Sequence, residues 1–356
     1  MKRFTFAVAA AASLAACADN PVTPEKAAEC TAKASLTPAM SLLGAPARSR
    51  LLESPRTVVV IPIRATALTN DAVAAGTDGS GPASWSKTAG TRRLTGITTV
   101  GDYNPAGQAA GNNPGKLVRR ESDGGVVAIG DSTASGDGAF GINSEGWVVG
   151  QQGNRAFFWT TCFGLKHLLP APAPEVTITS RAVDINTRGD IAGYIERRHR
   201  INPSDPGRRA TVWKAWSDER VEIAPPRHNH SEANAINDKG SVAGTVGNWG
   251  RGTQDRFPFF WTAEGGLVLI PVPDGSTWAS ATDINNNDEV VGWSRDSVTG
   301  SSHAWVWRRE TGTERLPEIG QASSTALAIN DWGDIIGMVG DQPVVWTWPE
   351  NAHRWR

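Results

Sequence analysis

The stretch "AVDINTRGDIAGY" at residues 182–194 returns with small changes further along the chain. Its clearest copies are "ANAINDKGSVAGT" at 233–245, "ATDINNNDEVVGW" at 281–293 and "ALAINDWGDIIGM" at 326–338. The Asn of the "IN" pair falls at Asn143, Asn186, Asn237, Asn285 and Asn330, and a glycine follows each of them seven residues later. Because self-similarity of this kind is typical of repeat architectures, the repeat decides the fold.

Two further copies keep the register while they lose residue identity. The segment "DYNPAGQAAG" places Asn104 and Gly111 in register, and "ATALTNDAVAAG" places Gly76 in register with Thr69 at the Asn position. A strand ending in Trp follows most copies, and in the three shortest such units the Trp lies 16 residues after the Asn position. The chain therefore has seven copies, with six as the alternative count.

Each unit is predicted to form four short strands. The first is the "A-x-x-I-N" segment, the second follows a tight Asn/Asp/Gly turn, and the third ends in Trp, as in "RATVW" at 209–213. The fourth is a segment such as "LVLIPV" at 267–272. Four strands in a unit of about 40–45 residues are typical of a β-propeller blade. The 38 Gly and 22 Pro also suit short strands joined by turns. We predict an all-β fold, a β-propeller of seven four-stranded blades.

The ring needs a strand from the other end of the chain. Little sequence follows Trp348, whereas "RTVVVIPI" at 56–63 resembles the fourth strand "GLVLIPV" at 266–272. We expect Val58–Ile63 to complete the last blade as its outer strand, because a closed ring protects its edge strands. The alternative is that "HRWR" at 353–356 supplies this strand.

The unit resembles the HAF repeat of bacterial extracellular repeat proteins, which joins the "A-x-x-I-N" phrase to His-Ala-Phe and Trp. The match is closest at "HAW" (303–305), next at "RAF" (155–157), and covers about residues 65–348. Elsewhere the His is replaced, for example by Arg209 and Phe257, so the chain does not treat it as indispensable. The resemblance implies an extracellular location and a propeller-like fold, and it supplies no catalytic residue.

The first twenty residues, "MKRFTFAVAAAASLAACADN", have the layout of an export signal. Two basic residues precede an apolar run, Phe4–Ala12, that is too short to span a membrane. The end of the signal, "LAAC", resembles the lipobox of bacterial lipoproteins, in which the cysteine is acylated after cleavage. We expect residues 1–16 to be removed, Cys17 to carry lipid, and Ala18 to direct the protein to the outer membrane or cell surface. A plain secretory signal is the alternative.

Residues 17–55, rich in Ala, Pro, Ser and Thr, are expected to form a flexible tether, and residues 56–356 a single propeller. Cys30 lies in the tether and Cys162 in the propeller. Export would permit them to pair. The preferred expectation is two unpaired thiols, because Cys30 lies in the tether.

The units that start at Asn186, Asn237 and Asn285 are longer than the others between the second and third strands. The extra residues lie in "ERRHRINPSDPGRR" (196–209), "NWGRGTQDRF" (248–257) and "SRDSVTGSSH" (294–303). These connections emerge on the face that carries the links between blades, where repeat proteins often build binding sites. The predicted ligand-binding residues are Arg197, Arg198, His199, Arg200, Arg208, Arg209, Trp249, Arg251 and Arg295. Such an arginine cluster suits a phosphate or an acidic glycan. The alternative is a solvated basic loop that acidic neighbours partly neutralise.

Three other patterns are weaker. The "HNH" at 228–230 has metal-like spacing, but no Cys or third His lies nearby, so no metal is expected. The "DINNNDE" at 283–289 is reminiscent of a calcium loop, yet the same positions are turn residues in the other units. The tryptophans outside the third strand could stack on sugars, but the preferred interpretation is that they pack between blades. They are Trp147, Trp249, Trp278, Trp293 and Trp332.

Charge and motifs limit the function. With 35 Lys plus Arg against 36 Asp plus Glu, no overall field favours nucleic acid. The chain lacks "G-x-S-x-G" and "H-E-x-x-H", so no catalytic residue and no cofactor are predicted. We expect a monomeric, membrane-anchored binding or scaffold lipoprotein that holds a protein or glycan through its long loops. The alternative is a polysaccharide-acting enzyme, hydrolase or lyase, with a site spread over several blades.

Overall fold

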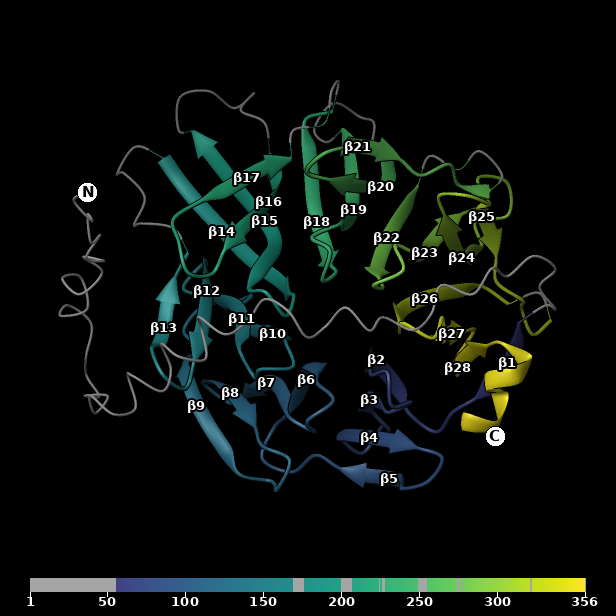
Figure 1. The fold of residues 1–356 in the computed structure, drawn as a ribbon, viewed down its shortest axis with the longest axis horizontal. Helices are drawn as coiled ribbons and strands as arrows, with labels where there is room; N and C mark the ends of the chain where they lie inside the picture. Colours follow the sequence, from purple (N-terminus) through teal and green to yellow (C-terminus); the bar gives the residue numbers. More distant parts are fainter. Residues whose placement is uncertain are drawn as a thin grey trace, which may run out of the picture.

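The computed structural model describes residues 56–168, 176–199, 207–223, 225, 228–248, 255–273, 276, 278–320 and 322–355, with only the backbone at 176–178, 198 and 199. Their strands form seven four-stranded sheets. The sheets surround a central axis as the blades of a propeller (Figure 1). The predicted seven-bladed fold is confirmed, and the alternative count of six is wrong.

The blades follow one another in chain order. Blade 1 consists of β2 (Arg64–Leu68), β3 (Ala74–Thr77), β4 (Pro82–Ser86) and β5 (Gly90–Arg93). Blade 2 consists of β6 (Thr99–Tyr103), β7 (Ala109–Asn113), β8 (Lys116–Arg120) and β9 (Val126–Asp131). Blade 3 consists of β10 (Gly138–Ile142), β11 (Val148–Gln152), β12 (Arg155–Thr160) and β13 (Gly164–His167). Blade 4 consists of β14 (Val176–Ile185), β15 (Asp190–His199), β16 (Arg208–Lys214) and β17 (Arg220–Ile223).

The remaining blades have the same order. Blade 5 consists of β18 (His230–Ile236), β19 (Val242–Asn248), β20 (Asp255–Thr262) and β21 (Gly266–Leu269). Blade 6 consists of β22 (Ala279–Ile284), β23 (Val290–Arg295), β24 (Ser302–Arg308) and β25 (Gly312–Arg315). Blade 7 consists of β26 (Ser324–Ile329), β27 (Ile335–Val339), β28 (Gln342–Thr347) and β1 (Thr57–Val60).

This topology gives the propeller two distinct faces. Each "A-x-x-I-N" segment forms the first strand of its blade, which borders the central channel, and the strands that follow are antiparallel to their neighbours. The turns after the first and third strands therefore share one face, named here the turn face. The connections after the second strand and the links between blades share the opposite face, named here the loop face.

The repeated glycine has a steric cause in all seven blades. A Cβ at each position would lie 2.0–2.2 Å from a carbonyl oxygen of the adjacent first strand. The seven are Gly76, Gly111, Gly150, Gly193, Gly244, Gly292 and Gly337. Each first strand shifts its register near this contact, as at Ala182/Asp184 in blade 4. The shift is a β-bulge, which brings the two backbones too close for any side chain.

The core lies between neighbouring blades rather than at the centre of the ring. One cluster joins Phe158 of blade 3 to Ile191 and Trp213 of blade 4. Another cluster joins Phe260 of blade 5 to Trp305 and Trp307 of blade 6. Because the small residues of the second strand alternate with large residues of the third, adjacent sheets can interlock at close range.

The ring closes through the start of the described chain. Strand β1 pairs with β28, from Thr57 opposite Thr347 to Val60 opposite Val344. This confirms the predicted outer strand, although the strand itself ends at Val60. The alternative is wrong, since residues 349–354 form the 3₁₀ helix η2 (Pro349–Arg354). Among the described residues no helix is long and apolar enough to cross a membrane.

Candidate functional site: the channel and the loop face

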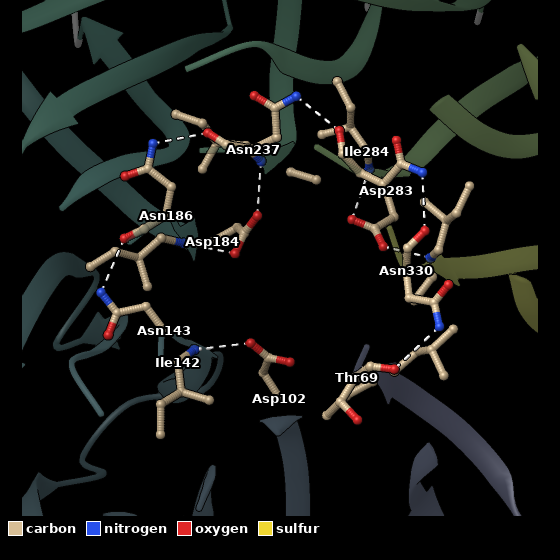
Figure 2. Close-up of a pocket in the computed structure, with 18 of the residues that line it drawn as sticks. Thr69, Asp102, Ile142, Asn143, Asp184, Asn186, Asn237, Asp283, Ile284 and Asn330 are labelled. Atoms are coloured by element: carbon tan, nitrogen blue, oxygen red, sulfur yellow. Dashed lines mark hydrogen bonds between the residues drawn. The ribbon is translucent and has the colours of Figure 1, made fainter. Parts of the chain in front are cut away.

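The repeated asparagines form a ring around the end of the channel on the turn face (Figure 2). Each Nδ2 donates to the backbone carbonyl oxygen of the equivalent residue in the next blade. These bonds are Asn104 to Asn143 at 2.9 Å, Asn143 to Asn186 at 3.0 Å, Asn186 to Asn237 at 2.9 Å, Asn237 to Asn285 at 2.9 Å, Asn285 to Asn330 at 3.0 Å and Asn330 to Thr69 at 3.2 Å. Thr69 has no side-chain amide, so blade 1 lacks the amide donor that makes this link to the next blade elsewhere in the ring.

The same asparagines also stabilise the turn that follows them. The Oδ1 of Asn186 accepts the backbone N–H groups of Arg188 at 3.0 Å and Asp190 at 2.8 Å. Asn285 bonds Asn287 and Glu289 in the same way, both at 3.0 Å. The predicted role of the phrase as a turn is therefore confirmed, and "DINNNDE" is one of these turns. The link between blades was not predicted.

Three aspartates line the channel one step inside this ring (Figure 2). They are Asp102, Asp184 and Asp283, each two residues before the repeated Asn, in blades 2, 4 and 6. One oxygen of each accepts the N–H of the next residue, and the other accepts an N–H from the following blade. The bonds to the following blade are Asp102 to Ile142 at 3.0 Å, Asp184 to Ile236 at 2.8 Å and Asp283 to Ile329 at 2.7 Å.

The channel environment raises the pKa of all three carboxyl groups above the ordinary value of 3.8. Burial raises the pKa of Asp102 to about 7 and that of Asp184 to about 6, and the neighbouring carboxylates Asp184 and Asp238, respectively, add to the shift. Burial also raises the pKa of Asp283 to about 8, with contributions from Asp184 and Asp102. Backbone N–H donors act in the opposite direction at each site, and burial outweighs them.

The channel holds a cavity of about 380 Å³ lined by residues of all seven blades. Its charged lining residues are the three aspartates together with Asp238 and Asp331, and the lining includes no Lys, Arg or His. The cavity is therefore acidic. Within the described ranges no three His, Cys, Asp or Glu side chains are grouped so that they could hold a metal ion.

The loop face is asymmetric because blade 4 projects from it. Strands β14 and β15 have ten residues each, whereas the first two strands of the other blades have four to seven. The predicted loop at 196–209 is thus partly strand, because β15 continues to His199 and β16 begins at Arg208. This raised sector, formed by the extended β14 and β15, belongs to the unit that starts at Asn186, which is one of the three units predicted to have long loops.

At the base of this sector, charged side chains of blades 4 and 5 form a partly buried cluster. Arg208 pairs with Glu196 at 3.1 Å and with Glu232, and its guanidinium lies 4.4 Å from the centre of the Tyr194 ring. His230 Nε2 lies 3.1 Å from Glu232 Oε1. Burial alone would raise the pKa of Glu232, but the hydrogen bond from His230 and the charge of Arg208 hold it at about 2.

The other predicted binding residues do not converge with Arg208 in the part of the chain that is described. Arg197 pairs with Glu222. Arg209 Nη1 donates to the carbonyl oxygen of Asn229 at 2.8 Å, and Arg295 Nε to that of Gly300 at 3.1 Å. The side chains of Arg198 and His199, and all of Arg200, Trp249 and Arg251, lie outside the described residues. The arginine grip on a ligand stays a prediction.

Two of the weaker sequence patterns have structural roles. His230 is buried against Glu232, and its neighbour His228 packs against Phe257 with ring centres 5.8 Å apart. Trp147 packs at right angles on Phe158 and Trp216, with ring centres 5.9 and 5.1 Å apart. Packing between blades is therefore confirmed for Trp147.

One sequence expectation is wrong. Cys162 is disulfide-bonded, so it is not a free thiol. It lies in the turn between β12 and β13 on the turn face. The only other cysteines, Cys17 and Cys30, lie outside the described residues. Assigning Cys30 to a flexible tether gave no physical reason for it to stay far from blade 3, because a flexible segment can reach a fixed partner.

The channel aspartates were missed, although the aligned copies carry a signal for them. The position two residues before the Asn is Asp in copies 2, 4 and 6 and Ala or Gly in copies 1, 3, 5 and 7. The small residues are Ala67, Gly141, Ala235 and Ala328. Each of the three aspartates accepts an N–H from the following blade, in which the equivalent residue is small, so the alternation marks contacts between neighbouring units of this protein.

Comparisons with known proteins agree with this architecture. Residues 147–304, less than half of the chain, match a family model described as "Protein of unknown function (DUF3466)". No curated protein matches the chain. The solved structure "Oligogalacturonate lyase in complex with manganese" is similar with a TM-score of 0.54 and 10% identity, over 83% of this chain and 92% of that chain. A chain of the "Mitotic Checkpoint Complex" is similar with a TM-score of 0.50 and 14% identity, over 83% of this chain and 94% of that chain.

At such identities the likeness shows the fold alone. The fold and the described sites define a seven-bladed β-propeller whose channel is acidic and whose loop face is raised at blade 4.

Proposed function

We propose that this protein is a non-enzymatic, lipid-anchored binding module of the bacterial cell surface, and that it holds a glycan on its loop face above blades 4–6. The observation that carries the proposal is the extension of β14 and β15 to ten residues each. This extension forms a wall, because the first two strands of the other blades have only four to seven residues in the described part of the chain. Proteins place binding sites on such irregular additions to a rigid scaffold.

The chemistry at the foot of the wall supports a sugar ligand. Arg208, Glu232 and His230 offer charged donors and acceptors side by side, and Arg208 is held over the Tyr194 ring. Sugar hydroxyl groups donate and accept hydrogen bonds, so a mixed and fixed set of partners suits them better than a surface of one charge. Acidic side chains neutralise the positive charge of the arginines in this cluster. The ligand therefore does not need to be an acidic glycan.

A glycan-binding screen of the soluble body, residues 56–356, tests this function. We expect binding that the double substitution Arg197→Ser/Arg208→Ser weakens by tenfold or more, about 1.4 kcal/mol. Arg92→Ser is the matched control, because Arg92 is exposed on β5 of blade 1, away from the wall. Binding that survives the double substitution unchanged, or a protein ligand in place of a glycan, would overturn the proposal as stated.

A second candidate is a polysaccharide-acting enzyme, and the raised pKa values of the channel aspartates favour it. A carboxylic acid with a pKa of about 7 or 8 is protonated near neutral pH and can act as a general acid. Against this, each of the three carboxylates already accepts two backbone N–H groups, one of them from the next blade. Turnover on a polysaccharide panel that Asp283→Asn abolishes would establish the enzyme.

A further inference from the structure

Arg181 brings a positive charge to the loop-face mouth of the channel, at the foot of the wall. It lies on β14 five residues before the repeated Asn, the position at which Gly138 begins β10 in blade 3. Its Nε donates to Oε1 of Gln151 at 3.1 Å, and its Nη2 donates to the carbonyl oxygen of Gly136 at 3.3 Å. Both acceptors are neutral, and within the described part of the chain no carboxylate pairs with Arg181.

The other blades leave no such charge at the equivalent position. Glu232 of blade 5 pairs with Arg208, and Arg64 of blade 1 lies 4.0 Å from Asp341. The four remaining positions are uncharged: Thr99, Gly138, Ser280 and Thr325. Of the charged residues at this level of the ring, Arg181 is therefore the one whose charge no described carboxylate neutralises.

The guanidinium of Arg181 is held at the edge of the channel. Its central carbon lies 4.7 Å from the centre of the Phe140 ring, and Phe140 lines the channel cavity. Its Nη1 makes no hydrogen bond to any residue that the structure describes. A guanidinium fixed by two hydrogen bonds and an aromatic ring has lost most of its freedom already, so its remaining N–H groups are prepared for a planar anion.

A second, independent observation is the hydroxyl group of Tyr194. Tyr194 is directly opposite Arg181 in the pairing of β14 with β15, and residues opposite each other in an antiparallel pair share a face. Only 8% of Tyr194 is exposed. A buried tyrosine hydroxyl usually has a hydrogen-bond partner, but this one has none among the residues described. It is a donor that still needs an acceptor.

The electrostatics of Tyr194 agree with this placement. Burial raises the pKa of Tyr194, while the positive charges of Arg181 and Arg208 act in the opposite direction. Both guanidinium groups are thus close enough to act on the phenol. The guanidinium of Arg208 lies 4.4 Å from the centre of the Tyr194 ring. Tyr194 therefore connects Arg181 to the charged cluster at the foot of the wall.

This set of groups selects a singly charged anion. An N–H of Arg181 and the O–H of Tyr194 are donors, so they suit an acceptor and not a metal ion. A phosphate carries up to two negative charges, and the nearby Glu232 and the acidic channel would repel it more strongly than a carboxylate. A carboxylate has one charge and two oxygens, one for each donor.

We propose that Arg181 and Tyr194 bind the carboxylate of a uronic acid at the loop-face mouth of the channel. The inference rests on the proposed function, because it names the chemical class of the glycan. One carboxylate oxygen accepts from Nη1 of Arg181 and the other from the hydroxyl of Tyr194. The hydroxyl groups of the same sugar, or of its neighbour in the glycan, bind the cluster of Arg208 and Glu232.

A ligand-observed NMR titration of the mature chain, residues 17–356, with methyl glucuronide and methyl glucoside tests the carboxylate site. The two sugars differ in a carboxylate that replaces a CH2OH group. We expect the glucuronide to bind at least tenfold more tightly at pH 7. Tyr194→Phe and Arg181→Gln should each weaken glucuronide binding about tenfold and leave glucoside binding unchanged.

Tyr103→Phe is the matched control, because Tyr103 is the other tyrosine of the chain and lies on β6 of blade 2. It should leave the affinity for both sugars unchanged. Tyr194→Phe removes one oxygen atom that has no described partner and keeps the ring against Arg208, so its melting temperature should equal that of the wild type.

Modification of arginines by phenylglyoxal, read by peptide mass spectrometry, locates the bound carboxylate. Methyl glucuronide should slow the modification of Arg181 several-fold, and methyl glucoside should not. Arg92, exposed on β5 of blade 1, is the internal control and should react equally in all samples.

Equal affinity for the two sugars, no binding of the glucuronide, unchanged glucuronide binding in Tyr194→Phe, or protection of Arg92 instead of Arg181 would overturn this inference. Failure of the proposed function is a different result. A neutral glycan that binds and is lost on Arg197→Ser/Arg208→Ser, with no preference for the glucuronide, would support the proposed function and refute the carboxylate site.

Discussion

At the scale of single residues, the repeated Asn takes part in three kinds of hydrogen bond, two through its side-chain amide and one through its backbone. Its Oδ1 accepts two turn N–H groups, its Nδ2 donates to the next blade, and its backbone oxygen accepts from the previous one, as at Asn186. Thr69 shows what is lost on replacement. Its Oγ1 still accepts the N–H of Val73 at 3.2 Å, so the turn persists, but the side-chain amide that donates to the next blade is missing.

Thr69→Asn is therefore expected to stabilise the protein. It supplies the missing donor opposite the carbonyl oxygen of Asn104, and a net hydrogen bond contributes about 1 kcal/mol to the free energy of unfolding. The reverse change, Asn186→Thr, removes a link that exists at 2.9 Å and should cost about 1–2 kcal/mol. Urea denaturation of both variants measures the two effects. A Thr69→Asn protein no more stable than the wild type would contradict the ring as a source of stability.

At the scale of elements, the ring depends on β1, the strand that joins the start of the propeller to its last blade. The N–H of Ile61 donates to the carbonyl oxygen of Pro343 at 3.0 Å. Because alternate residues of a strand face the same side, the N–H of Val59 also faces β28, whereas that of Val60 faces outward. Trp355 of the C-terminal segment stacks on Trp85 of blade 1, with ring centres 6.0 Å apart. Strand β1 and the C-terminal segment therefore both contribute to the junction of blades 7 and 1.

Val59→Pro should weaken this junction more than Val60→Pro. Proline removes an N–H at either position, but only at Val59 does the lost group face a partner strand. We expect a fall of about 2–3 kcal/mol in the free energy of unfolding for Val59→Pro, and less than about 1 kcal/mol for Val60→Pro. Denaturation curves, together with sedimentation to detect association through the unpaired edge of β28, measure the outcome. Equal losses in the two variants would refute the role assigned to β1.

At the scale of the whole molecule, the sequence repeat predicted the architecture, whereas the candidate sites depend on contacts between neighbouring repeat units. The Asn-to-Gly spacing and the Trp position predicted strands, turns and blade count, because each depends on neighbours within one unit. The side chains of Asp102, Asp184 and Asp283 act between units, so the register of one copy alone does not show them. The Arg208 cluster depends on Glu232, which lies in the following blade and is 24 residues away.

The channel aspartates also give the whole molecule a pH dependence whose sign can be derived. Their folded-state pKa values of about 7, 6 and 8 exceed the ordinary 3.8. Between about pH 4 and pH 8 the folded protein therefore binds protons that the unfolded chain has released. The free energy of unfolding then decreases as the pH rises through the folded-state values. Groups with lowered pKa values, such as Glu232, contribute stability that is lost only in stronger acid.

The expected result is a melting temperature that is higher at about pH 5.5 than at about pH 8, because the carboxyl groups that repel one another in the acidic cavity are then partly neutral. Asp184→Asn, which is neutral at both pH values, should reduce this difference, while Asp341→Asn on the loop face should leave it unchanged. Calorimetry of the three proteins at both pH values measures it. A melting temperature that stays level or rises over this interval would mean that the backbone donors, and not burial, control the ionisation of the channel.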